Sequence, residues 1–402
     1  MTATEGPARY VRLARVPGVL SLGAASAVAR LPLGMTGLAL LLLVQVRTGS
    51  YQQAGAAVGC FALASAAGSP ARGRLADRFA PVPVLLVTGV AQPVALVGVV
   101  VATASARPHP APVLLAVALA GLLVPPVGPV SRAVWQRLVT APDLARAAFA
   151  LDSLLLQLIF YVVAPPVVAV LATSADPAVA VIAIAVLTVI GNVAVAASPA
   201  VRSVPRRRGS VHLLGPLTEP RLIVVLLTST VAAAAFAALE VAVASAAVSR
   251  GATGASGLLL ALIGVGSIAG GLFYGARSPA VSMAAQYRRW LVVLAMGTAP
   301  LVVATTTPVL GVLLVAAGLA IGPVSTSQFT LVGELAPTGT LTEAFTWLFS
   351  AALGGTALGS YLAGTATQQY GVEIALALPC ALALATLGLA VAVRGASTTP
   401  EP

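Results

Sequence analysis

The stretch "GPVSRAVWQRLVTAPDLARAAF" occupies residues 128–149, and "GPVSTSQFTLVGELAPTGTLTEAF" occupies residues 322–345. Both begin with Gly-Pro-Val-Ser, both carry an Ala-Pro and both end with Ala-Phe, at offsets of 194, 195 and 196 residues. Three matches in the same order suggest that one unit has been written twice. Whether this is a duplication depends on how the rest of the chain is divided.

The composition sets the class of protein. Of the 402 residues, 59% are hydrophobic and only 8% are charged, and the mean hydropathy is +1.01. A soluble domain normally carries about 25% charged residues. The apolar stretches reach the roughly 20 residues that a helix needs to cross hydrocarbon. We therefore expect an all-α membrane protein in a lipid bilayer, and the ten-residue alternating segments of a membrane β-barrel are missing.

Proline, glycine and arginine divide the chain into twelve candidate transmembrane helices. Their approximate limits are 17–45, 53–72, 82–104, 111–137, 144–173, 177–199, 221–249, 255–276, 288–305, 308–332, 342–368 and 372–393.

The arginines predict the orientation of these helices. All 22 basic residues are Arg, and with the N-terminus inside, the outer loops hold only Arg47, Arg107 and Arg250, against seventeen in the inner segments. Positive residues favour the cytoplasmic side, so both termini are expected in the cytoplasm of a multi-pass protein of the cell membrane. This placement explains the net charge of +11 without nucleic acid.

The longest polar segment, residues 201–221, separates two six-helix halves, residues 1–200 and 222–402. The duplicated phrase crosses helices 4 and 5 and then helices 10 and 11, so the copies are six helices apart in the same orientation. This is the parallel repeat of one class of transporters.

A second motif supports that assignment. "GSPARGRLADRFAPVP" (68–83) lies between helices 2 and 3 and resembles the loop signature of the major facilitator superfamily, Gly-x-Leu-x-Asp-Arg-x-Gly-Arg-Arg. Gly73, Leu75, Asp77 and Arg78 match, whereas the basic end of the motif is missing. The resemblance implies twelve transmembrane helices in two pseudo-symmetric six-helix bundles.

The resemblance also implies a role for Asp77. It would meet a helix N-terminus or an arginine of the other half and hold the inner face shut. A carboxylate gains about 0.3–1 kcal/mol at an exposed helix N-terminus, so the contact could open and close. The alternative is that Asp77 only neutralises a loop that sets the topology.

Helix 5 contains "IFYVVAPPVVAVLA" (159–172), which loosely resembles the antiporter motif of the superfamily. Ala164 replaces the usual glycine, and Pro165 is kept. With it, the chain resembles proton-coupled bacterial exporters of small organic molecules, and we expect a monomeric secondary transporter. A proton-coupled importer is the first alternative, and a non-transporting receptor or scaffold is the second.

Four ionisable residues lie inside apolar spans: Arg30, Arg132, Asp152 and Glu240. Each costs roughly 2.5–3.5 kcal/mol in mid-helix unless it meets a partner or a wet cavity. At 1.5 Å per residue, Arg30 lies about 20 Å and Glu240 about 28 Å from their helix starts. We expect these two to pair, or to compete for one ligand or proton; a fixed structural ion pair is the alternative.

Asp152 lies about 12 Å into helix 5. A buried carboxylate without a firm partner can take up a proton near neutral pH, so Asp152 is the second candidate proton carrier. The equal alternative is that it pairs with Arg132, which is expected to snorkel or to brace.

Further polar candidates are Gln157 and Tyr161, which share a helical face, and Gln328 in helix 10. Glu334 and Glu343 flank the turn between helices 10 and 11. Inner arginines are expected near this turn, namely Arg277, Arg288 and Arg289. They are interpreted as an inner clasp of the second half, or as solvated loop charges.

Several activities are excluded. A chain without lysine has no Walker-type ATP site. His109 and His212 lie in predicted loops, and Cys60 and Cys380 stand alone, so no metal site, cofactor or enzyme activity is expected. The predicted partners are a small-molecule substrate and protons.

Overall fold

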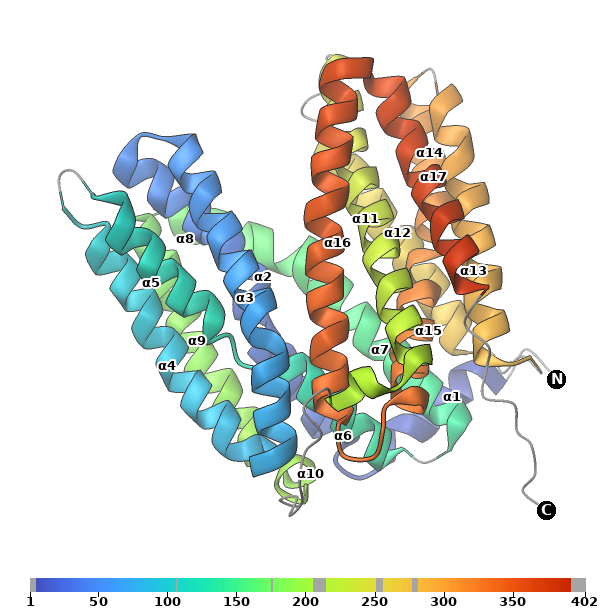
Figure 1. Ribbon diagram of the computed structural model, residues 1–402, viewed down its shortest axis with the longest axis horizontal. Helices are drawn as coiled ribbons and strands as arrows, with labels where there is room; N and C mark the ends of the chain where they lie inside the picture. Colours follow the sequence, from blue (N-terminus) through green and yellow to red (C-terminus); the bar gives the residue numbers. More distant parts are fainter. Residues whose placement is uncertain are drawn as a thin grey trace.

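The computed structural model describes residues 5–105, 108–139, 141–174, 176–204, 215–250, 256–276, 281–304 and 306–391. Within these ranges the chain is helical and contains no β-strand (Figure 1). Its elements are α1 (Glu5–Ala14), α2 (Val19–Thr48), α3 (Tyr51–Phe79), α4 (Pro81–Ala102), α5 (Pro110–Leu122), α6 (Val127–Leu138), α7 (Pro142–Gln157), the π-helical turn η1 (Leu158–Val163), α8 (Ala164–Ser174), α9 (Pro177–Ala197), α10 (Pro199–Arg202), the 3₁₀ turn η2 (Gly215–Thr218), α11 (Pro220–Ser249), α12 (Ser256–Gly275), α13 (Met283–Thr298), the 3₁₀ turn η4 (Ala299–Val303), α14 (Thr307–Gly318), α15 (Ile321–Leu335), α16 (Leu341–Tyr370) and α17 (Val372–Ala390).

The predicted all-α membrane fold is confirmed, because each predicted span coincides with one helix or with an interrupted helix. By length and composition alone, nine helical segments of the described chain could cross a membrane. The other three predicted spans, in α7–α8, α13 and α16, fall outside those limits. Helix 4 is broken between α5 and α6 at Pro125 and Pro126, since proline has no amide hydrogen for the helical ladder. Helix 10 is interrupted at a similar point, between the end of α14 at Gly318 and the start of α15 at Ile321.

Helix α1 was not predicted. It is a short amphipathic helix, and Gly18, in the left-handed region at φ 85°, separates it from α2. Leu13 is fully buried, and the Tyr10 hydroxyl donates to the carbonyl of Leu272 in α12 at 3.1 Å. Burial raises the pKa of Tyr10 to about 12, so this hydroxyl remains a donor throughout the physiological range. The first helix of the chain is therefore bonded to a helix of the second half.

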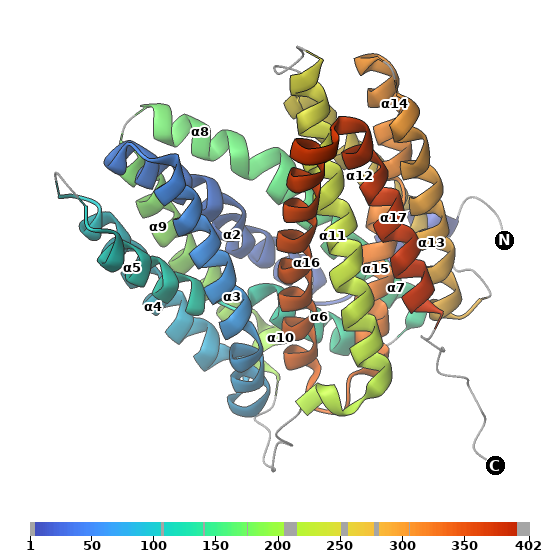
Figure 2. The same ribbon diagram turned by 45° about the horizontal axis from the view of Figure 1, so that its top comes forward.

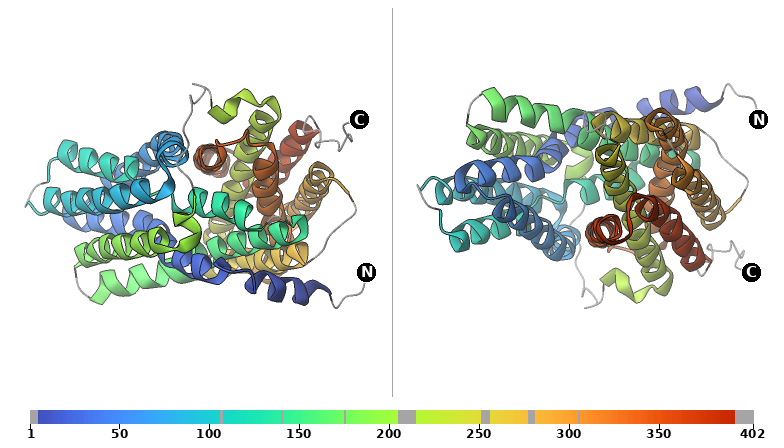
Figure 3. Two further views of the ribbon diagram at one scale, coloured as in Figure 1. Left: turned by 90° about the horizontal axis from the view of Figure 1, so that it is seen from below. Right: turned by 90° about the horizontal axis from the view of Figure 1, so that it is seen from above.

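The remaining helices form two groups. Figures 1 and 2 show α2–α5 and α9 on one side and α11–α17 on the other, and the views in Figure 3 separate the same groups. The groups touch along two main lines: α3 packs along α16, and α7 packs along α12 and α15. In span numbers, helix 2 meets helix 11 and helix 5 meets helix 8. Helix 8 is the repeat of helix 2 and helix 11 is the repeat of helix 5, so the two contacts are equivalent, as a pseudo-twofold arrangement of two repeats requires.

The two groups are joined at one end of the molecule. Figures 1 and 2 show α3 and α16 close together where α3 ends and α16 begins, and diverging towards the opposite end. The side-chain bonds between these helices run from the Ala66–Ser350 pair to the first turn of α16. We call the end at which α3 ends and α16 begins the latched end.

Candidate functional site

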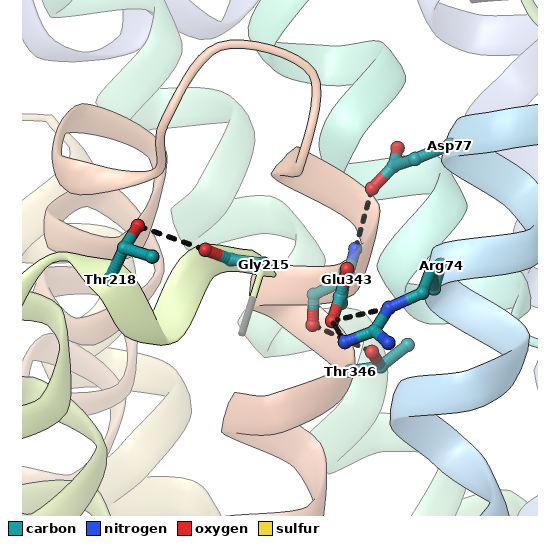
Figure 4. A network of polar contacts seen from close by, with 6 residues as sticks. All are labelled: Arg74, Asp77, Gly215, Thr218, Glu343 and Thr346. Carbon is teal, nitrogen blue, oxygen red and sulfur yellow. Dashed lines mark hydrogen bonds and ion pairs between the residues drawn. The ribbon is translucent and has the colours of Figure 1, made fainter. Parts of the chain in front are cut away.

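The latched end is built around Asp77. Its Oδ2 accepts from the amide of Glu343 at 2.8 Å (Figure 4). Its Oδ1 accepts from the amide of Thr342 at 3.2 Å. The first amides of a helix have no acceptor within that helix, and the N-terminus attracts negative charge. Asp77 therefore lies on the N-terminus of a helix from the other half, which is one of the two partners that the resemblance implied.

A second contact reinforces the first. Arg74 Nη2 lies 2.6 Å from Glu343 Oε1, and its Nε donates to the same oxygen at 3.1 Å. Sequence reasoning interpreted Glu343 as part of an inner clasp near arginines of its own half, or as a solvated charge. Glu343 does join the two halves, but its partner Arg74 belongs to the first half. The Glu343 side chain is 1% exposed, because α16 begins against α3. Of the arginines then named, Arg277 lies outside the described residues.

Gly73 allows the close approach of α3 and α16. A Cβ atom at this position would lie 2.3 Å from Thr346 Oγ1 and 2.8 Å from the Cα of Glu343, closer than any real contact. The other matched residues of the motif face away from this contact. Leu75 is exposed, and the exposed Arg78 lies 5.3 Å from the centre of the Phe79 ring. Only the glycine and the aspartate of the four matches join the two helices.

Further into the first half, three buried ionic residues form a triad. Arg30 Nη2 lies 2.6 Å from Asp152 Oδ1, and Arg132 Nε donates to Asp152 Oδ2 at 2.8 Å. All three side chains are at most 5% exposed. They come from α2, α6 and α7, so one carboxylate joins three helices of one half.

The expected pair of Arg30 with Glu240 was wrong. The helix starts of the structure place Arg30 about 17 Å and Asp152 about 15 Å from the latched end, whereas Glu240 lies about 30 Å along α11. The predicted difference in depth between Arg30 and Asp152 arose from errors of two residues at each helix start. Arg30 thus meets Asp152 at its own level, and Glu240 lies half-buried nearer the opposite end.

The hypothesis that Asp152 carries a proton assumed that its carboxylate has no firm partner. The structure instead gives it two, of which Arg132 was the predicted alternative. Arg132 does brace, but it also reaches the other half: its guanidinium carbon lies 3.9 Å from the centre of the Phe329 ring in α15. A cation over an aromatic face is attracted by the ring quadrupole, so the triad is in contact with both halves.

A cavity of about 260 Å³ lies beside the triad. Except for Phe349 of α16, every residue that lines it belongs to the first half. Its polar lining includes Arg30, Arg132, Gln157 and Gln92, and the last of these was not predicted. Leu33, Val124, Leu156 and Phe160 supply apolar walls.

Arg72 also lines the cavity and was missed as a site residue. Sequence reasoning ended helix 2 at this arginine and assigned it to a loop, but α3 continues for seven residues to Phe79. The guanidinium group donates to the carbonyls of Ser65 at 3.0 Å and of Leu122 at the end of α5. The wider Gly-x-Leu-x-Asp-Arg match, which begins next to Arg72, was the available signal that the helix continues.

The remaining predicted residues are dispersed. Gln328 is buried in α15, where its Nε2 donates to the Tyr287 hydroxyl at 3.1 Å, and it does not line the cavity. Glu334 is exposed near the end of α15. Ala164 begins α8 directly after the π-helical turn η1 and is fully buried. The side chains of Tyr161 and Pro165 lie outside the described residues.

The described residues contain no cluster of three or more His, Cys, Asp or Glu side chains that could hold a metal ion. The chemistry of this part of the chain is therefore that of arginines, one carboxylate and amides beside an apolar wall. Side chains of these kinds can hold a ligand by charge, hydrogen bonds and apolar contact.

Comparison with known proteins gives a consistent answer. The family model described as Major Facilitator Superfamily matches residues 22–338. No curated protein matches the sequence significantly. Among solved structures, the human organic anion transporter MFSD10 (TETRAN) superposes with a TM-score of 0.74 at 16% identity, covering 94% of this chain and 99% of that one.

Two further structures have the same fold. A bacterial homologue of the iron transporter ferroportin in its outward-facing state has a TM-score of 0.77 at 14% identity, covering 94% of this chain and 99% of that one. The proton:xylose symporter XylE, bound to 6-bromo-6-deoxy-D-glucose, has a TM-score of 0.70 at 13% identity, covering 94% and 96%. At these identities the likeness shows the fold alone.

Proposed function

The chain belongs to the major facilitator superfamily, and from this premise we propose that it exports a small organic molecule across the cytoplasmic membrane in exchange for protons. In this proposal residues 1–200 and 222–402 rock against each other around the cavity, joined by the linker 201–221. The protein acts as a monomer, and both termini lie in the cytoplasm.

The observation that carries the proposal is a buried charged cavity beside an interface that is joined at one end only. The arginine count places the latched end at the cytoplasm, so the state described here is closed to the inside. Export then requires a second state in which α3 and α16 separate. Asp77 and Arg74 make the contacts that this step would break.

The strength of these contacts suits a reversible latch. Hydrogen bonds to charged groups contribute about 1.5–3 kcal/mol each. Asp77 accepts two such bonds, and Arg74 forms an ion pair with one carboxylate oxygen of Glu343. The sum is a few kcal/mol, which substrate and proton binding can offset in the other state.

For proton coupling we propose Asp152 and Glu240 as the candidate carriers. Protonation of Asp152 would remove the charge that binds both Arg30 and Arg132, and Arg132 would pass the change to Phe329 in the other half. The direction of transport rests on the Ala164-Pro165 dipeptide in helix 5, where the preceding π-helical turn marks an irregular segment of the kind often found at functional sites.

Proton-coupled import is a second candidate, and one observation favours it. Asp152 is bonded to two arginines at once. If a proton neutralised Asp152, both guanidinium groups would be free to bind an anion, so proton and anion would occupy the same state and move together.

Transport in everted membrane vesicles separates these functions. A proton gradient is imposed, and each compound in a panel of metabolites and antibiotics is tested for its uptake and for dissipation of the gradient when it is added. For an exporter we expect gradient-driven uptake into everted vesicles that is lost in Asp152→Asn or Glu240→Gln. Uptake only in right-side-out vesicles would favour the importer, and no proton-dependent movement in either would reject proton coupling.

A further inference from the structure

The cavity beside the triad has an excess of positive charge. Its lining contains Arg30, Arg72 and Arg132 and no acidic residue. The one carboxylate bonded to them is Asp152, which pairs with Arg30 and Arg132. Arg72 is bonded only to backbone carbonyls. The triad alone therefore carries a net charge of about +1 on side chains that are at most 5% exposed, where uncompensated charge is unfavourable.

Part of this charge lacks any partner. The side chain of Arg30 is 2% exposed, and Nη2 faces Asp152, but Nε and Nη1 have no hydrogen-bond partner within the described residues. Buried donors are normally satisfied. Two unsatisfied donor nitrogens on a buried cation that lines a cavity indicate a place for an anionic acceptor.

The backbone on the other side of this place favours an anion as well. The first turn of α6, residues 127–129, lines the cavity. The Val127 amide donates to the carbonyl of Pro125 at 2.9 Å and Pro129 has no N–H, so the Gly128 amide is the donor that this helix N-terminus offers to an anion. At Gly128 an added Cβ would lie 3.9 Å from both Arg30 Nε and Arg132 Nη1. Gly128 thus leaves room between the helix end and the two guanidinium groups.

We propose that this cavity binds a small organic monoanion, with its carboxylate between Arg30, Arg132 and the N-terminus of α6. A single negative charge matches the net charge of the triad. The apolar body of the ligand lies against Leu33, Val124 and Phe160. This proposal names the substrate class of the transporter proposed above and rests on that function for its physiological meaning.

The test uses the full-length protein in lipid nanodiscs and benzoate as the probe, with neutral benzamide and cationic benzylamine as matched comparison compounds. Isothermal titration at neutral pH measures affinity. We expect benzoate to bind at least tenfold more tightly than either comparison compound. Equal binding of all three, or preference for benzylamine, would overturn the proposal.

Two variants locate the site. Arg30→Gln should weaken benzoate binding at least tenfold, while Arg132 still pairs with Asp152. Gly128→Ala should weaken it about threefold to tenfold by filling the space for the carboxylate, and it leaves the fold intact because the added methyl group makes ordinary contacts. The control is Arg47→Gln, whose ion pair with Asp176 is half-exposed at the end of α2; it should bind like the wild type.

Wild-type affinity in both Gly128→Ala and Arg30→Gln would overturn the proposal. The readout is independent of transport. Arg30-dependent benzoate binding by a protein that moves no substrate in vesicles would remove the proposed function and leave this inference standing. Proton-coupled transport of neutral or cationic substrates without benzoate binding would overturn this inference and leave the proposed function standing.

Discussion

The two copies of Gly-Pro-Val-Ser begin equivalent helices and have acquired different surroundings. Both open the second part of a broken span, α6 in the first half and α15 in the second. Gly128 lies beside two guanidinium groups, and a Cβ there would make only ordinary contacts, 3.9 Å from a nitrogen of each. A Cβ at Gly322 would lie 2.4 Å from the carbonyl oxygen of Ser267 and 3.0 Å from Gly271. The same four residues leave a cavity in one half and produce close helix packing in the other.

The residues that follow the two copies differ in the same sense. At the offsets of 194 and 196 that align the copies, Arg132 corresponds to Thr326 and Asp152 to Leu348. Thr326 is buried and donates to the carbonyl of Gly322 at 2.9 Å, and Leu348 is buried among apolar residues. The buried triad therefore has no counterpart at these two positions of the second half, where Thr326 bonds within its own helix.

The largest expected effect comes from copying the second half into the first. Asp152→Leu leaves two buried arginines without their carboxylate, and removal of one partner of a buried ion pair costs about 3–5 kcal/mol. We expect the free energy of unfolding in detergent micelles to fall by that amount.

The control is the combined variant Arg30→Met, Arg132→Thr and Asp152→Leu. It replaces all three charges by uncharged groups and should recover most of the stability, without recovering transport. If Asp152→Leu unfolded like the wild type, the triad would not be a buried, mutually dependent group.

The two glycines give the next largest contrast. Gly322→Ala places a methyl group against a backbone carbonyl, and overpacking costs about 1–3 kcal/mol. Gly128→Ala should change stability by less than about 0.5 kcal/mol, as substitutions without strained contacts do. The measurement is thermal denaturation of the two purified variants side by side. An equal loss of stability in both variants would contradict the comparison.

A third prediction concerns the latch. Asp77→Asn keeps one acceptor oxygen of two, so one charge-assisted bond becomes neutral and the other is lost, and the closed state should lose about 1.5–3 kcal/mol. Distances between spin labels on α3 and α16 should then show an increased population open at the latched end, and turnover should change. Arg78→Ala, at an exposed position of the same motif, is the control; wild-type turnover of Asp77→Asn in the membrane would reject the latch.

The smallest effect is expected at α1. Tyr10→Phe removes one hydrogen bond to the carbonyl of Leu272, worth about 0.5–1.5 kcal/mol, and keeps the ring. Hydrogen exchange of the α1 amides should accelerate slightly, with no change in substrate affinity. An unchanged exchange rate would mean that α1 is held by Leu13 and its apolar neighbours alone.

The sequence predicted the number of spans and the duplicated halves because hydropathy, proline and glycine act locally. The partner of Arg30 could not be obtained in this way, since it depends on helix register and rotation. An error of two residues at the start of each of the two helices was enough to hide that Arg30 and Asp152 lie at one depth. Arg74 and Arg72 were missed for a related reason, because α3 extends beyond the apolar run that defined helix 2.

Gly73 has a practical consequence for studying the other conformation. The seam between α3 and α16 closes only because position 73 has no side chain. A leucine there acts as a spacer that the closed arrangement cannot accommodate, whereas a state with these helices separated has room for it. Gly73→Leu should thus trap the transporter facing inward, and such a sample would be suited to determining the second structure of the cycle.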